Sequence, residues 1–83
     1  MSFLLIGERP DVLLIKYKLL NRNSRLNIQQ CYSFKSAEEK LKQSSFDCVI
    51  CSLFPSQNTN IQYWMLGKFN QKFQVPIKVW QGE

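Results

Sequence analysis

The sequence predicts a single α/β domain built on a four-stranded parallel sheet with helices on both faces. Short apolar runs that suit buried strands alternate with longer segments that suit helices, and no hairpin turn signal separates the runs. The chain has 83 residues, of which 45% are hydrophobic, which is enough for one small core. Its three glycines and three prolines are too few for a low-complexity or disordered tract.

The first apolar run, residues 2–6, fits a central strand that is buried on both faces. Pro10 and Asp11 follow it, and both residue types are favoured in the first turn of a helix. Residues 11–21 are therefore expected to be helical. The alternation over residues 15–18 also fits a strand, which is the competing interpretation.

The middle of the chain continues the alternation. Residues 25–32 place alternate apolar side chains on one face, as in a half-exposed edge strand. A capping box that begins at Ser36 and ends at Glu39 predicts a short helix over residues 37–44.

The last half of the chain predicts one strand, one helix and a closing strand. Residues 47–53 form a nearly continuous apolar run that ends at a proline and a polar loop, which indicates a second central strand. Residues 75–80 predict the last strand, because their proline is tolerated at a strand's start or edge. Between them, apolar side chains recur every four residues, as on an amphipathic helix: Ile61, Met65, Phe69 and Phe73.

This order of elements resembles the receiver domain of bacterial response regulators, whose flavodoxin-like fold is a three-layer sandwich. Three stretches carry the resemblance: FLLIGERP at 3–10, FDCVICSLFP at 46–55 and VPIKVWQG at 75–82. They cover four of the family's five strand–helix units. The resemblance therefore implies a receiver-like sandwich with a four-stranded sheet, truncated relative to the family.

The chemistry of the family is not reproduced at the matching positions. Gly7 and Glu8 stand where receivers carry an acidic pair, Ser52 replaces the phosphoacceptor aspartate, and Gln81 stands at the switch threonine or serine. Phosphoryl transfer in receivers needs a carboxylate nucleophile and further carboxylates around Mg²⁺. Ser52 beside a single glutamate does not supply that set. Glu8, Ser52 and Gln81 are therefore predicted to form a degenerate phosphoacceptor region.

The resemblance implies that residues 1–83 form one pseudo-receiver domain, similar in kind to those of cyanobacterial clock proteins. We expect a non-catalytic module that binds a signalling or clock protein in the cytoplasm, with no cofactor and no metal. The sequence contains no histidine, which excludes a serine–histidine triad and histidine-containing zinc sites. Its apolar runs are also far too short to span a membrane.

Cys48 and Cys51 form a C-x-x-C pair, which raises the alternatives of a redox enzyme or a metal site. Side chains three residues apart in a strand point to opposite faces, so the two sulfurs are not expected to meet. Cys31 brings the total to three thiols, whereas a four-cysteine site needs four. Buried structural cysteines in a reducing compartment are the favoured interpretation.

The net charge is +5, and the excess of bases lies between residues 9 and 42. Lys16, Lys18, Arg22 and Arg25 are expected to form a basic surface along the first helix and its exit. Such a surface suits a solvated helix face, an acidic protein partner or nucleic acid. The chain has no helix-turn-helix pattern, so nucleic acid is the less favoured partner. A small basic nucleic-acid-binding regulator is the alternative function.

Two further surfaces are candidate partner contacts. Tyr63 and Trp64 are adjacent on a predicted helix and cannot both point inward, so one is expected to be exposed, either as an interface anchor or beside the core. Val79 and Trp80 lie on the last strand, which is expected to be an open edge of the sheet. That edge favours pairing with another chain, including a homodimer, unless more of a longer protein covers it.

Overall fold

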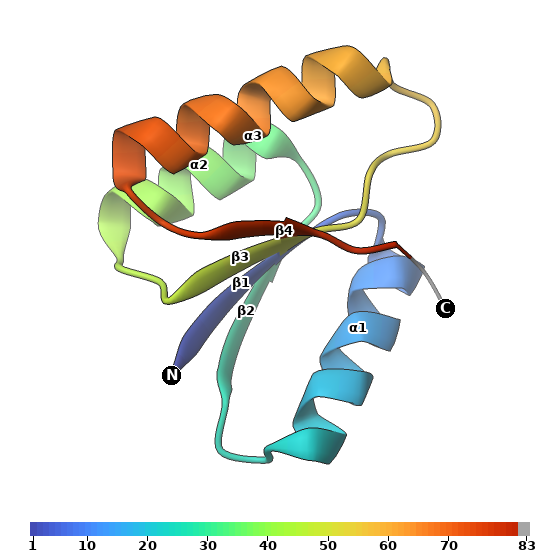
Figure 1. The fold of residues 1–83 in the computed structure, drawn as a ribbon. Coiled ribbons are helices and arrows are strands. Elements are labelled where there is room, and N and C mark those ends of the chain that lie inside the picture. The colour runs from blue at the N-terminus through green and yellow to red at the C-terminus, as the bar shows by residue number, and fades with distance from the viewer. Residues whose placement is uncertain (82–83) are drawn as a thin grey trace.

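The computed structural model describes residues 1–81, and its elements follow the predicted order (Figure 1). The elements are β1 (Ser2–Ile6), α1 (Arg9–Arg22), β2 (Asn27–Cys31), α2 (Phe34–Gln43), β3 (Cys48–Cys51), α3 (Thr59–Phe73) and β4 (Ile77–Val79). The strands form one parallel sheet in the order β2-β1-β3-β4. The predicted α/β class with a four-stranded parallel sheet is confirmed, and it is compatible with a flavodoxin-like three-layer sandwich.

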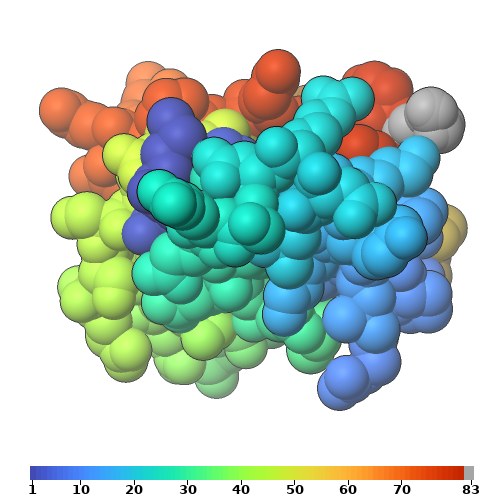
Figure 2. All heavy atoms as spheres, turned by 90° about the horizontal axis from the view of Figure 1, so that it is seen from below, coloured from blue at the N-terminus to red at the C-terminus, as the bar shows by residue number. Residues whose placement is uncertain are grey.

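The helices cover the two faces of the sheet unequally. α1 lies alone on one face, whereas α2 and α3 lie side by side on the other (Figure 1). Figure 2 views the molecule from below, where the blue and cyan atoms of α1 and the following loop occupy much of the surface and the red atoms of the last segment appear at its upper margin. The sheet therefore has one doubly covered face and one face with a single helix.

Each face of the sheet has its own core. Phe34, Phe54 and Phe69 lie in the core under α2 and α3, where the ring centroid of Phe34 is 5.5 Å from that of Phe54 and 6.3 Å from that of Phe69. The core under α1 is smaller and contains Leu5 and Ile50. Leu5 and its neighbours in β1 are fully buried, which confirms that this strand is central and covered on both faces.

α1 is a helix, so the competing strand interpretation of residues 15–18 is wrong. The helix begins at Arg9, two residues before the predicted start, and Pro10 occupies its first turn. Proline suits this place because the first-turn N–H groups have no partner within the helix. The three strands after β1 are each shorter than their predicted ranges, because ladder pairing ends before the apolar runs do.

The predicted capping box at Ser36 is wrong, because the structure caps α2 with Ser33. The Ser33 hydroxyl accepts a hydrogen bond from the backbone N–H of Ser36 at 3.1 Å. The helix therefore begins at Phe34, three residues before the predicted start, and buries that side chain in the core. Burial of Phe34 explains the earlier start, since an aromatic side chain in the first turn gains free energy by leaving water.

The buried side of α3 also differs from the predicted stripe. Gln62, Leu66 and Phe69 are buried, whereas Ile61 is 58% exposed. The Gln62 side chain accepts from the backbone N–H of Phe54 at 2.7 Å and donates to the carbonyl oxygens of Phe54 at 2.9 Å and Gln57 at 3.2 Å. The helix is therefore rotated so that the Gln62 amide faces the backbone of the β3–α3 loop and Ile61 faces solvent.

Candidate functional site around the end of β4

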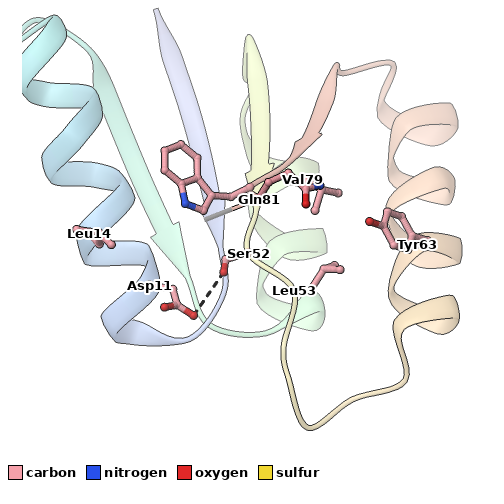
Figure 3. A pocket seen from close by; sticks show the side chains of 8 residues that line it. Asp11, Leu14, Ser52, Leu53, Tyr63, Val79 and Gln81 are labelled. Carbon is pink, nitrogen blue, oxygen red and sulfur yellow. Dashed lines mark hydrogen bonds between the residues drawn. The ribbon is translucent and has the colours of Figure 1, made fainter. Parts of the chain in front are cut away.

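A crevice of about 320 Å³ is lined by α1, which follows β1, by the residues that follow β3, by α3 and by the end of β4 (Figure 3). β1 pairs with β2 on one side and with β3 on the other, so the order of strands reverses here. Open α/β sheets bind ligands at this kind of position. Ser52 and Gln81, two of the predicted site residues, line the crevice, whereas the exposed Glu8 is not among its lining residues.

Asp11, rather than Glu8, is the acidic residue beside Ser52. The Ser52 hydroxyl donates to the Asp11 carboxylate at 3.4 Å, as the dashed line in Figure 3 marks. Asp11 lies in the first turn of α1, where the helix dipole favours a negative charge. Sequence reasoning explained Asp11 by that dipole alone and missed it as a site residue. The available signal was that α1 begins directly at the end of β1, which brings its first turn to the crevice.

Close approach of two strands explains the glycine at the end of β1. A Cβ on Gly7 would lie 3.1 Å from both the Cβ and the carbonyl oxygen of Ser52, and 3.3 Å from the Val12 side chain. The backbone N–H of Ser52 donates to the carbonyl of Ile6 at 2.8 Å, which holds the two strands together there. A side chain at this position would therefore push Ser52 and Val12 away by a few tenths of an ångström, and the positive φ of Gly7, 158°, adds backbone strain for any other residue.

The three thiols do not come together as a reactive group. Cys48 lies in the α1 core and Cys51 in the α2–α3 core, which confirms that their side chains point to opposite faces. Burial raises the pKa of Cys51 to about 12 and that of Cys31 to about 11. Burial also raises the pKa of Cys48, although Lys78 opposes the shift. All three are therefore thiols at neutral pH, and a thiol is a weak nucleophile and metal ligand.

The basic residues predicted for α1 do not share one face. Lys18 and Arg22 lie one helical turn apart on the same side, whereas Lys16 projects roughly 160° away from Lys18, because each residue rotates the helix by about 100°. The Lys18 ammonium lies 5.9 Å from the centroid of the Trp80 ring. Arg25 follows the helix, in the exposed loop before β2. Lys18 and Arg22 therefore lie toward β4, and Lys16 does not join them.

Tyr63 and Trp64 are both exposed, at 47% and 62%, although the adjacent pair predicted only one exposed ring. Gln62 and Leu66 take the buried side of α3, and this rotation turns both aromatic rings outward. Figure 3 shows Tyr63 pointing from α3 toward Val79 of β4. The Trp64 ring lies instead beneath the Lys68 ammonium, which is 4.4 Å from its centroid.

Three hollows meet at β4. Val79 lines all of them: the crevice, a groove of about 400 Å³ on the α1 side and a groove of about 410 Å³ on the α3 side. Trp80 lines the crevice and the α1-side groove, and Tyr63 lines the crevice and the α3-side groove. We call Tyr63, Ile77, Val79 and Trp80 the β4 surface. It brings together three predicted partner-binding residues and adds Ile77.

The described residues offer neither a metal-binding cluster nor a helix that could cross a membrane. Over residues 1–81, no three cysteine or acidic side chains lie close enough together to hold a metal ion. No helix in that range has the length and apolar character that crossing a membrane requires. Comparison of the chain with protein-family models, with curated proteins and with solved structures gave no match in any of the three.

Proposed function

We propose that this chain is a non-catalytic, receiver-like domain that binds a protein partner through the β4 surface. The observation that carries the proposal is the meeting of three hollows at β4, lined by the half-exposed Tyr63 and by Val79 and Trp80. Aromatic side chains are enriched in protein interfaces, where a rigid ring buries a large area at little cost in conformational entropy. A small domain gains little by exposing such residues unless a partner covers them.

The chemistry at the crevice supports a binding role. Ser52 and Asp11 form a single hydroxyl–carboxylate pair at 3.4 Å, which is long for an O–H···O hydrogen bond. A serine becomes a useful nucleophile when a general base takes its proton, and a single long contact of this kind contributes little activation. The resemblance to receivers supports a signalling role, in which Ser52 and Gln81 stand at positions that report phosphorylation in that family.

Site-specific crosslinking tests the proposal. The photoreactive amino acid benzoylphenylalanine replaces Tyr63 in one variant and Lys35 in the other, because Lys35 is exposed on α2, outside the β4 surface. After irradiation in an extract of the source cells, we expect a discrete protein adduct at position 63 and none at position 35. Equal labelling at both positions, or adducts with nucleic acid alone, would overturn the proposal.

Light scattering after size exclusion, with and without a DNA duplex, tests the other partner class. A protein that binds through phosphate contacts shifts onto DNA at about 50 mM salt and is released at about 200 mM salt. We expect no shift at either concentration, because Lys16 does not share a helix face with Lys18 and Arg22. A salt-sensitive shift would assign the function to nucleic acid.

A further inference from the structure

The outer edge of β4 presents backbone groups that are available for strand pairing. Within residues 1–81, β3 is the only strand beside β4. The carbonyl of Pro76 accepts from the N–H of Val49 at 2.9 Å, and the N–H of Trp80 donates to Cys51 at 2.8 Å. Alternate residues of a parallel strand bind the same neighbour. The N–H and C=O groups of Ile77 and Val79 therefore point away from β3, toward the open edge.

Two grooves that differ in charge flank this edge. On the α3 side, Ile77 and Val79 form a groove with Tyr63 and Leu66 and present a largely apolar surface. On the α1 side, Lys78 and Arg22 line the other groove together with Phe3, Cys48, Ile50 and Trp80. Successive side chains of a strand point to opposite faces. A strand added beside β4 would therefore place alternate side chains against two largely apolar grooves, of which the one on the α1 side also carries the bases Lys78 and Arg22.

Charge argues against a second copy of this chain at the edge. β4 spans three residues with Lys78 at its centre. A two-fold, antiparallel pair centred on β4 would place Lys78 opposite the same residue of the other copy, and like charges directly opposite one another are destabilising. Arg22 lines the same groove, and each chain carries a net charge of +5. The edge is therefore unsuited to self-pairing and suited to an acidic strand.

We propose that an extended, acidic segment of a partner protein adds to the sheet as a strand beside β4. The proposal rests on the protein-binding function argued above and names the partner's chemistry. The segment exchanges backbone hydrogen bonds with Ile77 and Val79, and its apolar side chains fill the groove against α3. Its carboxylates, at the intervening positions, meet Lys78 and Arg22.

A synthetic probe tests strand addition directly. The probe is a capped peptide of about eight alternating glutamate and valine residues, the usual length of a strand. We expect it to slow the exchange of the Ile77 and Val79 amide hydrogens, as measured by NMR, and to weaken as salt rises. Two control peptides, one of alternating lysine and valine and one methylated on alternate backbone nitrogens, are expected to give no protection. Equal protection by either control would overturn the proposal.

Variants of the 83-residue chain separate backbone pairing from charge. Val79→Pro removes an N–H that faces the open edge, so we expect a folded protein that no longer binds the probe. Lys78→Glu tests the charge without changing the backbone. We expect roughly tenfold weaker binding of the acidic peptide to this variant, and binding of the lysine peptide that the parent does not show. Lys35→Glu makes the same charge change on α2 and is expected to bind like the parent. Equal affinities for Lys78→Glu and Lys35→Glu would refute the charge argument.

Failure of this inference is distinguishable from failure of the proposed function. If the probe leaves the Ile77 and Val79 amides unprotected while crosslinking at position 63 persists, strand addition is wrong and protein binding stands. If the amides stay unprotected and crosslinking at position 63 is also lost, both strand addition and the proposed protein-binding function are wrong. Protection of these amides in the protein alone, together with a dimeric mass by light scattering, would show instead that a second copy occupies the edge.

Discussion

Replacement of Gln62 by leucine should destabilise the fold although it places an apolar side chain in the core. Gln62 is 1% exposed, and its amide satisfies a donor and an acceptor of Phe54 and an acceptor of Gln57. Leucine has a similar size but makes no hydrogen bonds. The N–H of Phe54 would then be buried without a partner. The carbonyl of Phe54, which also accepts from the backbone N–H of Gln57 at 3.2 Å, and the carbonyl of Gln57 would each lose one hydrogen bond.

The size of the effect follows from these contacts. The unpaired N–H of Phe54 costs about 1 to 3 kcal/mol, and each of the two lost carbonyl hydrogen bonds costs about 0.5 to 1.5 kcal/mol, which together come to about 4 kcal/mol at the central values. The leucine side chain recovers about 1 to 2 kcal/mol by its own burial. We therefore expect a net loss of about 2.5 kcal/mol in the free energy of unfolding, from the central values of the two contributions. A domain of this length has about 4 to 12 kcal/mol in total, so the loss is readily measured.

Urea unfolding followed by tryptophan fluorescence measures the loss. Gln71→Leu is the matched control, because Gln71 lies on the same helix and is exposed. We expect this control to change the free energy of unfolding by less than about 0.5 kcal/mol. Equal effects of the two substitutions, or a Gln62→Leu protein as stable as the parent, would refute the claim that this amide holds the loop.

A second substitution, Gln62→Glu, should make the stability of the fold depend on pH. The carboxyl group introduced by Gln62→Glu can donate to the Phe54 carbonyl only when it is protonated, so folding raises its pKa above the ordinary value of about 4.3. The folded state then binds the proton more tightly than the unfolded state. The stability of this variant is therefore highest below that ordinary pKa and falls as the pH rises through the folded pKa. The parent should show no such step.

Three further predictions concern the backbone, the helix cap and the thiols. Gly7→Ala brings a Cβ to 3.1 Å from Ser52, just after β3, and should lower the free energy of unfolding by about 1 to 3 kcal/mol. Gly67→Ala meets nothing within 4 Å and should raise that free energy by about 0.5 to 1 kcal/mol. Urea midpoints measure both changes. Ser33→Ala should lower the free energy of unfolding by about 1 kcal/mol and Ser36→Ala by far less, because Ser33 supplies the capping oxygen. A larger effect of Ser36→Ala in thermal unfolding would contradict this assignment of the cap. Folding raises the pKa of Cys51 from 9.0 to about 12, so its stabilising contribution is complete below pH 9 and is lost as the pH rises toward 12. Alkaline unfolding of Cys51→Ala should lack that part of the slope, and an unchanged slope would contradict the assignment.

The alternation of strands and helices was predictable because it is local. Residues 2–6 and 47–53 are apolar on both sides of the strand, and only a strand covered by helices on both faces buries such a run. The opposite directions of Cys48 and Cys51 follow from the two-residue period of a strand in the same way. These properties depend on neighbours in the chain, so class, element order and the direction of the thiols could be read from the sequence.

Contacts between distant residues decided the rest. Ser52 meets Asp11 across 41 positions, and that pairing depends on where α1 begins relative to the end of β3. The identity of the buried residue on α3 was set by the unpaired backbone of Phe54, which favours the Gln62 amide over the more hydrophobic Ile61. Hydrophobic periodicity predicts which side chains are buried only from the free energy of transferring each side chain out of water. Only the tertiary structure shows which backbone groups still need a partner. The three hydrogen bonds that the Gln62 amide makes to such groups together outweigh the gain from burying the Ile61 side chain instead.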